Sequence, residues 1–518
     1  MLTLLSRVLG MLRDVLTAHL LGAGMVSDAL TYAWTLPNAF RRLFGEGALS
    51  SALVPALTRA EQEQGRQAAR ALVCQIVSTL VLGLSALVAL IIAGLSVAQW
   101  WFPSLASDPS AALTLRFTQL LLPYMVVVSV LAQLVATLNV FGEFARPAAV
   151  PSVLNLVWIV GVGAATWFGP EVTLQPGAAV DALAEGAPQP AHALIIIASI
   201  FLASVVQVFW LLPRLRALGL GLRFVRPRLS PEVRGVLAAM GPMILGMGAA
   251  QLNILADRTI AKVALPDGGT THLYYGMRLM QFPLGLVSVA LVTTVFPALA
   301  RLATARNHAG AVETARTALR ANLLLCTGAA TGLFVLATPI VAMLFEGGSF
   351  SPENTRLTSS ALLGYALGIP CAGTVMLLTR TSIAAGDLRL PARIGVLMVF
   401  VNITLDLALV GPLGELGLAL ATSVASLGSA ILLLVFVAPR VKARPSELLG
   451  GWFRPLLVAL VMGAAVHLLD GRLLAASAPP LVRVACGSLL GLVVFASLAR
   501  ALCPAAWREL AGLLPGRR

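Results

Sequence analysis

The sequence predicts an all-α protein that crosses a membrane many times. Three observations support this fold class: 58% of the 518 residues are hydrophobic, only 11% are charged, and apolar stretches of membrane-spanning length recur along the chain. A soluble globular protein does not need so apolar a composition. The five cysteines lack CxxC and metal-ligand spacing, so we expect neither a disulfide framework nor a zinc site.

Fourteen apolar segments, each about 20 residues long, lie between charged breaks and breaks rich in glycine or proline. Their approximate first residues are Leu2, Asp28, Ala71, Leu113, Pro147, Ala191, Pro231, Thr271, Ala315, Leu357, Pro391, Leu416, Trp452 and Leu481. We therefore predict fourteen transmembrane helices.

The charge of the connections alternates, and this predicts the orientation of the helices. Basic connections follow the second, sixth, eighth and twelfth segments, as with Arg66 and Arg70 after the second. Other connections are neutral or acidic, such as the stretch from Glu171 to Glu185. By the positive-inside rule the basic connections are cytoplasmic. Both termini are therefore expected in the cytoplasm.

An internal repeat indicates two lobes of six helices each. Residues 47–59 resemble residues 285–301, and the Gly-Glu pair at 142–143 recurs as Gly-Asp at 386–387. Because each repeat holds an even number of helices, the lobes should share one orientation, related by a pseudo-two-fold axis along the membrane normal. The predicted division is an N-terminal lobe at 1–220, a C-terminal lobe at 221–440, and helices 13 and 14 at 441–518.

Four arginines lie inside the first two apolar segments, with one acidic residue between the pairs. Arg7 and Arg13 belong to the first segment, and Arg41 and Arg42 to the second, after Asp28. An arginine at the centre of a membrane helix costs roughly 2.5 to 3.5 kcal/mol on insertion scales. A single one could instead lie at a helix end and extend to the lipid headgroups. Four together predict a polar cavity that binds an anion.

The second half adds two further arginines. Arg278 has no acidic neighbour in sequence, whereas Arg258 follows Asp257, and these two could neutralise each other. Together with the arginines of the first half, Arg278 could surround a phosphate or pyrophosphate, because a guanidinium group matches phosphate oxygens with paired donors.

The sequence argues against ATP hydrolysis, nucleic-acid binding and catalysis. Neither lysine, Lys262 or Lys442, belongs to a Gly-Lys-Ser/Thr phosphate loop. The basic residues lie in short connections or inside helices, not in one continuous patch. The five histidines are scattered, and no Ser-His-Asp or paired-carboxylate arrangement stands out. We therefore predict a transporter that is not an enzyme and requires no cofactor.

Four stretches carry a resemblance to a known family. They are residues 6–14 (SRVLGMLRD), 22–29 (GAGMVSDA), 36–48 (LPNAFRRLFGEGA) and 274–283 (YYGMRLMQFP). The chain resembles the MurJ (MviN) lipid II flippases of the multidrug/oligosaccharidyl-lipid/polysaccharide exporter superfamily. The resemblance implies a fourteen-helix inner-membrane protein of bacterial peptidoglycan synthesis and cell-shape maintenance. It also implies that the protein flips lipid II, the undecaprenyl-pyrophosphate-linked disaccharide-pentapeptide, from the cytoplasmic to the outer leaflet.

The resemblance also implies a mechanism and a site. Alternating access would carry the headgroup through a central cationic cavity, while helices 13 and 14 form a groove for the lipid tail. The family's essential charged residues map onto five positions of this chain, to which we add Arg42, Glu46 and Arg258. The predicted substrate-binding set is Arg7, Arg13, Asp28, Arg41, Arg42, Glu46, Arg258 and Arg278.

The driving force has two candidates, Na⁺ and the membrane potential. Asn402 and Asp406 lie four residues apart on one helix face, and their oxygens could bind Na⁺ together with Thr422 and Asp257. The resembling family includes members with such a cation site. The alternative for these residues is helix-to-helix hydrogen bonding plus a pair between Asp257 and its neighbour Arg258. A membrane potential would act on the charge of the site.

The expected partners are lipid II and other proteins of cell-wall synthesis, with the chain acting as a monomer. Two departures from the family stand out: Gln281 replaces a common Glu, and members usually begin about ten residues earlier, which leaves open a start upstream of Met1.

Two competing functions remain. An exporter of cationic drugs would conflict with an arginine-rich cavity, which repels cations. An envelope enzyme would need a catalytic arrangement that the sequence does not show, and a scaffold would not explain the internal repeat.

Overall fold

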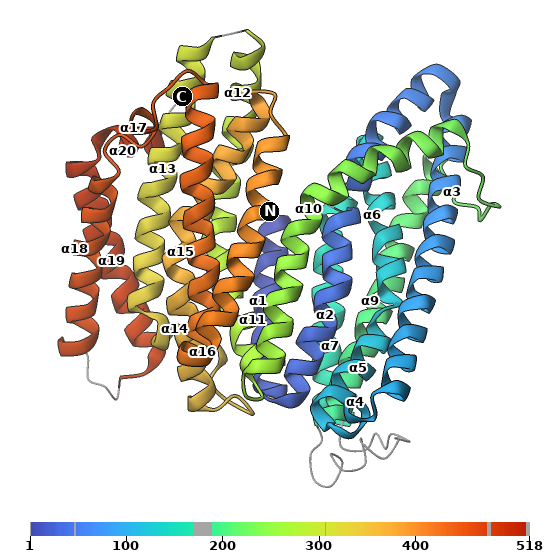
Figure 1. Cartoon of the computed structure of the whole chain (residues 1–518), viewed down its shortest axis with the longest axis horizontal. Coiled ribbons are helices and arrows are strands. Elements are labelled where there is room, and N and C mark those ends of the chain that lie inside the picture. The colour runs from blue at the N-terminus through green and yellow to red at the C-terminus, as the bar shows by residue number, and fades with distance from the viewer. Residues whose placement is uncertain (1, 46–47, 169–188, 306, 474–477, 514–518) are drawn as a thin grey trace. The chain divides into compact units, whose positions relative to one another are not determined.

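The computed structural model describes residues 2–45, 48–168, 189–305, 307–473 and 478–513, and these ranges are almost entirely helical (Figure 1). The helices are α1 (Leu2–Leu21), α2 (Met25–Phe40), α3 (Ala48–Trp101), α4 (Pro103–Ser107), α5 (Pro109–Leu121), α6 (Tyr124–Val140), α7 (Ala145–Phe168), α9 (Gln189–Ala217), α10 (Pro231–Ala264), α11 (Gly269–Leu286), α12 (Ser288–Thr304), α13 (His308–Val335), α14 (Ala337–Phe345), α15 (Pro352–Ala384), α16 (Arg389–Arg440), α17 (Pro445–Leu448), α18 (Phe453–Leu468), α19 (Pro480–Leu502) and α20 (Pro504–Leu513), with π-helical turns η1 (Arg41–Gly45) and η3 (Leu469–Leu473). The predicted all-α class is confirmed.

Ten stretches of the described chain are long and apolar enough to cross a membrane. All fourteen predicted segment starts lie in a described helix, except Trp452, which immediately precedes α18. α1 is not among the ten, because Arg7, Arg13 and Asp14 together lower its apolar character. A polytopic membrane protein is therefore established, whereas the number of fourteen crossings stays a prediction.

Two long helices contain a glycine that interrupts the helical backbone. Gly65 in α3 has a φ of 83°, and Gly414 in α16 has a φ of 56°. These left-handed values are easily reached only by glycine, which lacks a Cβ atom. α3 and α16 are therefore each two helices joined at a kink.

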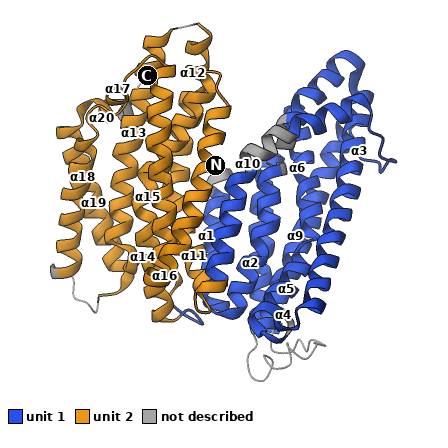
Figure 2. Cartoon of the chain, in the orientation of Figure 1, with its two compact units in different colours: residues 1–262, 347–350 blue, residues 263–346, 351–518 orange. Residues whose placement is uncertain are grey.

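The described chain forms two compact units (Figure 2). Unit 1 holds residues 1–262 and 347–350, and unit 2 holds residues 263–346 and 351–518. In unit 1, α2 packs against α5, α1 packs along α7, and α7 packs along α9. In unit 2, α15 packs against α11, α13 and α16, while α18 packs between α13 and α19. The predicted division at 220 and 440 stays a prediction.

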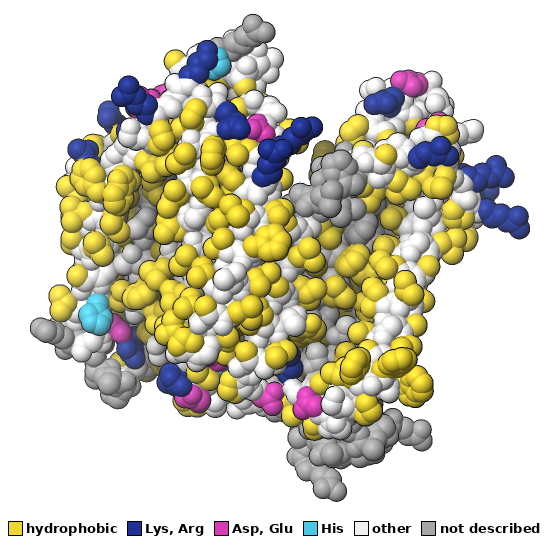
Figure 3. Space-filling view, viewed as in Figure 1, with side chains coloured by type: hydrophobic (Ala, Val, Ile, Leu, Met, Phe, Trp, Pro, Cys, Tyr) yellow, Lys and Arg dark blue, Asp and Glu magenta, His cyan; other side chains and the backbone are white. Residues whose placement is uncertain are grey.

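The surface separates apolar flanks from charged ends. On the face drawn in Figure 3, hydrophobic side chains cover the flanks of each unit, and charged side chains gather toward the ends. In unit 1 two basic connections lie together, because Arg66 donates a hydrogen bond to the carbonyl of Leu218 and Arg70 donates one to that of Gly221. The predicted acidic connection 171–185 lies outside the described residues.

One turn recurs in both units, and we call it the Gly-acid turn. In unit 1 Gly142, at a φ of 76°, precedes Glu143, which pairs with Arg214 near the end of α9. In unit 2 the corresponding residues are Gly386, at a φ of 87°, Asp387, and Arg440 at the end of α16, with a nitrogen-to-oxygen distance of 2.8 Å. The sequence echo at 142–143 and 386–387 thus has a matching local structure.

Candidate functional site

Arg13 of α1 is buried within unit 1, where its guanidinium group has several partners. Its side chain is 7% exposed, and its Nε and Nη2 atoms donate to Oδ1 of Asp14 at 3.0 and 2.6 Å. Its Nη1 atom donates to Oδ1 of Asn155 on α7 at 3.2 Å. A buried charge is tolerated when it is paired and hydrogen-bonded, so this arrangement stabilises a cation inside an apolar helix bundle.

Aromatic rings lie beneath this guanidinium group. The Cζ atom of Arg13 lies 4.5 Å from the ring centroid of Trp158, which contacts Trp34 edge to face at 5.2 Å. Trp34 in turn stacks on Tyr124 at 5.5 Å. Asn155 and Trp158 are three residues apart and so share one face of α7. That face therefore supplies both an amide and an aromatic surface to Arg13.

The other three arginines of the first two apolar segments are only partly buried. Arg7 lies two turns before Arg13 on α1, and no described residue forms an ion pair with it. Arg41 and Arg42 belong to η1, the π-helical turn after α2, and Nε of Arg41 donates to Asn38 at 3.1 Å. Single π-helical turns often occur at functional sites. The structure thus keeps three cationic side chains accessible near buried helices.

Asp28 of α2 is almost fully buried, at 1% exposure, and lies near Lys262. Its Oδ2 atom is 3.9 Å from Nζ of Lys262 on α10. The same Nζ donates to the hydroxyl of Ser110 on α5 at 2.6 Å. Asp28 therefore shares the interior of unit 1 with a cation that sequence alone did not assign to it.

The remaining predicted substrate-binding residues are distributed over both units. Arg258 is buried on α10 of unit 1 next to Asp257, a predicted Na⁺ ligand that accepts a hydrogen bond from Asn253 at 3.2 Å. Arg278 is half-buried on α11 of unit 2. Glu46 lies outside the described residues.

The predicted Na⁺ ligands engage one another or their own helix. Nδ2 of Asn402 donates to Oδ2 of Asp406 at 2.9 Å, and both side chains are buried in unit 2. Thr422 donates to the carbonyl of Leu418, one turn earlier on the same helix. Within the described ranges, no cluster of three or more His, Cys, Asp or Glu side chains could hold a metal ion. The Na⁺ site stays a prediction.

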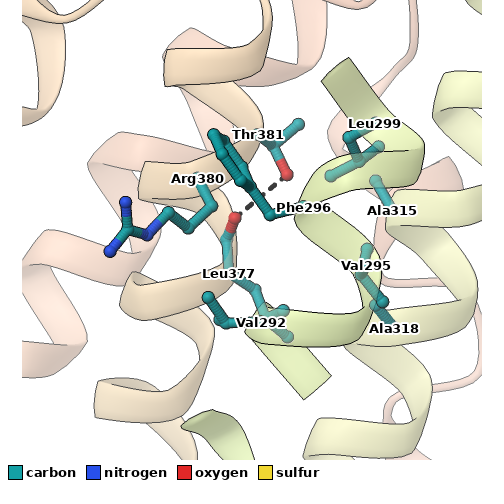
Figure 4. A pocket seen from close by; sticks show the side chains of 9 residues that line it. All are labelled: Val292, Val295, Phe296, Leu299, Ala315, Ala318, Leu377, Arg380 and Thr381. Carbon is teal, nitrogen blue, oxygen red and sulfur yellow. Dashed lines mark hydrogen bonds between the residues drawn. The ribbon is translucent and has the colours of Figure 1, made fainter. Parts of the chain in front are cut away.

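Unit 2 contains two polar features that the sequence analysis missed. His272 is buried between Glu415, 3.1 Å from its Nδ1 atom, and Asn354, 3.2 Å from its Nε2 atom. Arg380 lies at the rim of an apolar pocket between α12, α13 and α15, with its guanidinium group directed away from the lining (Figure 4). The Cζ atom of Arg380 is 5.5 Å from the ring centroid of Phe296.

Sequence comparison identifies the family. Residues 17–478 match the family model described as "Lipid II flippase MurJ". The chain belongs to the lipid II flippase MurJ family. It is 32% identical over 469 residues to a probable lipid II flippase MurJ of Rhizobium meliloti (strain 1021), covering 90% of this chain and 84% of that protein. It is 30% identical over 478 residues to the lipid II flippase MurJ of Burkholderia cenocepacia, covering 90% and 87%.

Solved structures support the same fold. A structure described as "Lipid II flippase MurJ, inward closed conformation" aligns with a TM-score of 0.74 at 24% identity, covering 97% of this chain and 98% of that one. An inward-facing multidrug resistance MATE family transporter of the MOP superfamily aligns with a TM-score of 0.67 at 14% identity, covering 84% and 94%. The MurJ family consists of transporters, not enzymes, so the chain is an integral transporter of the inner membrane.

Proposed function

We propose that this protein flips lipid II from the cytoplasmic to the outer leaflet of the inner membrane and so supplies the precursor for peptidoglycan synthesis. Its MurJ relatives are named for this activity. The observation that carries the proposal is the set of arginines in the first two apolar helices, Arg7 and Arg13 on α1 and Arg41 and Arg42 after α2. Membrane-embedded cations are retained where they serve a substrate or ion path.

The headgroup chemistry matches these residues. The diphosphate of lipid II is anionic, and a guanidinium group donates two parallel hydrogen bonds to phosphate oxygens. Arg7, Arg41 and Arg42 are partly exposed and can meet such a ligand directly. Arg13 is held by Asp14 and Asn155, so its direct contact with a diphosphate requires an exchange of hydrogen bonds. The polyprenyl tail stays in the lipid phase, along a groove at helices 13 and 14.

The transport cycle in this proposal is alternating access. Fourteen membrane crossings form two six-helix lobes and two additional helices, and both termini lie in the cytoplasm. The two lobes move against each other around a central cationic cavity, to which the C-terminal lobe contributes Arg278. Glycines such as Gly414, which already interrupt helices, are suitable points for bending.

The driving force in the proposal is a cation gradient or the membrane potential. A Na⁺ site formed by Asp257, Asn402, Asp406 and Thr422 would supply only oxygen ligands, which Na⁺ prefers as a hard cation. Transport by reconstituted protein should then fall when Na⁺ is replaced by choline. If transport is unchanged in choline, the Na⁺ site is refuted and the membrane potential remains.

Complementation tests the substrate site. In cells depleted of their own flippase, Arg13→Ala or Arg278→Ala should abolish growth support when compared with the wild type at matched protein levels. Arg356→Ala is the matched control, because this arginine forms an exposed pair with Glu353 on α15, at 69% side-chain exposure. Full complementation by both Arg13→Ala and Arg278→Ala would refute the proposed site.

A further inference from the structure

Asn155 is a polar residue in the otherwise apolar run from Val153 to Val157, and both ends of its amide contact α1. Its Oδ1 atom accepts from Nη1 of Arg13 at 3.2 Å, and its Nδ2 atom donates to the carbonyl oxygen of Ser6 at 2.9 Å. The side chain is 6% exposed. One amide on α7 therefore fixes two points of α1 that lie two helical turns apart.

We propose that Asn155 is a positioning residue that orients the arginines of α1 for a diphosphate ligand. The inference rests on the proposed function, since the ligand is the diphosphate of the lipid headgroup. Asn155 does not itself contact the ligand in this account. It acts through Arg13, whose guanidinium group it orients, and through the turn of α1 that carries Ser6 and Arg7.

The geometry explains why an amide serves this role. Asp14 accepts from Nε and Nη2 of Arg13, and Trp158 covers one face of the guanidinium group, so Asn155 fixes the remaining nitrogen, Nη1. A neutral amide orients Arg13 without reducing its positive charge. A carboxylate at position 155 would keep the acceptor but add negative charge where an anion must bind. It would also lose the donor for the carbonyl of Ser6.

Ser152 provides a matched control on the same helix. It lies three residues before Asn155, is also 6% exposed, and its hydroxyl has no hydrogen-bond partner in the part of the chain that the structure describes. Ser152→Ala therefore removes a buried polar group of α7 without removing a hydrogen bond to α1.

Binding measurements on the purified full-length protein test the proposal with two probes, lipid II and inorganic pyrophosphate. Asn155→Leu removes both hydrogen bonds at similar volume, and Asn155→Asp keeps the acceptor but adds charge. Asn155→Leu loses a hydrogen bond to a charged group, and Asn155→Asp places negative charge beside the anion site, so we expect each variant to weaken binding about tenfold or more. Ser152→Ala should bind as the wild type does.

Double variants separate positioning from a general loss of structure. If Asn155 acts through Arg13, then Asn155→Leu should add little to the effect of Arg13→Lys, whose ammonium group cannot reproduce the guanidinium contacts. In an Arg41→Lys background the same change should keep its full effect. Additive effects in both backgrounds would contradict the role assigned to Asn155.

The two probes distinguish failure of this inference from failure of the proposed function. Wild-type affinity for both probes in Asn155→Leu would overturn the inference and leave the proposed function intact. If the wild type binds pyrophosphate but not lipid II, and Asn155→Leu still weakens pyrophosphate binding, the inference holds and the proposed substrate is wrong. A wild type that binds neither probe overturns both.

Discussion

Units 1 and 2 share the Gly-acid turn but bury different charges. Among the described residues, unit 1 buries cations as well as carboxylates: Arg13, Asp14, Asp28, Asp257 and Arg258. In the same ranges unit 2 buries one histidine and two acidic residues but no arginine or lysine: His272, Asp406 and Glu415. The two units thus have the same Gly-acid turn between helices but different charged residues in their interiors.

The Gly-acid turn and the buried arginine differ in what each requires of its surroundings. The Gly-acid turn depends on a glycine at positive φ and an exposed acid-to-arginine pair, which any copy of the fold can keep. A buried arginine instead needs a carboxylate, an amide and a ring in defined places, as around Arg13. Unit 1 thus buries arginines beside carboxylates, while unit 2 keeps its described arginines at least partly exposed.

The largest expected effect follows from removing a buried charge partner in unit 1. Asp14→Ala leaves the buried guanidinium group of Arg13 without its carboxylate, and breaking such a pair costs about 3 to 5 kcal/mol. Chemical denaturation of the purified protein in detergent should show this loss. A cost close to that of Ser152→Ala would mean that the pair does not stabilise unit 1.

Removing a buried partner in unit 2 should cost less. Glu415→Ala leaves His272 with Asn354 as its remaining side-chain partner among the described residues, and leaving a buried polar group without one hydrogen bond costs about 1 to 3 kcal/mol. The same denaturation experiment measures the effect. A cost above that of Asp14→Ala would reverse the contrast drawn between the two units.

The Gly-acid turns should respond equally to one substitution. Gly142 and Gly386 both adopt positive φ, and an added Cβ atom meets no atom within 4 Å at either position. The cost of Gly142→Ala and of Gly386→Ala is therefore backbone strain alone, about 1 to 2 kcal/mol in each case. Clearly different costs, measured by denaturation of the two variants, would show that the turns are not equivalent.

The smallest effect depends on pH. The backbone N–H of Leu390 and the guanidinium group of Arg440 hold the pKa of Asp387 below its ordinary value of 3.8. The ionised carboxylate therefore stabilises the fold above that value, and the stabilisation is lost as the pH falls through the lowered pKa. Asp387→Asn should be less stable than the wild type at neutral pH, with a difference that disappears in acid. A difference independent of pH would contradict this.

The sequence was sufficient for the helices and for the charged positions, because both depend on local composition. Apolar runs predicted the fold class, and Arg13 was identified by its cost in lipid. Its partners could not be predicted in the same way. Neighbouring residues on a helix do not usually face each other, which hid Asp14, and Asn155 lies 142 residues away on another helix.

Two other features also depended on tertiary structure. Lys262, at the end of α10, reaches Asp28 of α2 and Ser110 of α5 only in the folded chain, and no local pattern encodes these contacts. Gly65 lies in a polar stretch that was predicted as a connection, yet α3 continues through it with a kink. A polar asparagine inside an apolar run was the one available signal for Asn155.

The most direct test measures how much lipid II becomes accessible to an impermeant reagent outside cells depleted of their own flippase. The wild-type protein is compared with Arg278→Ala and Arg13→Ala at equal protein level. We predict exposure of lipid II with the wild type and its loss in both variants. Equal exposure in all three proteins would contradict the cationic site, and no exposure even with well-expressed wild type would contradict lipid II as the substrate.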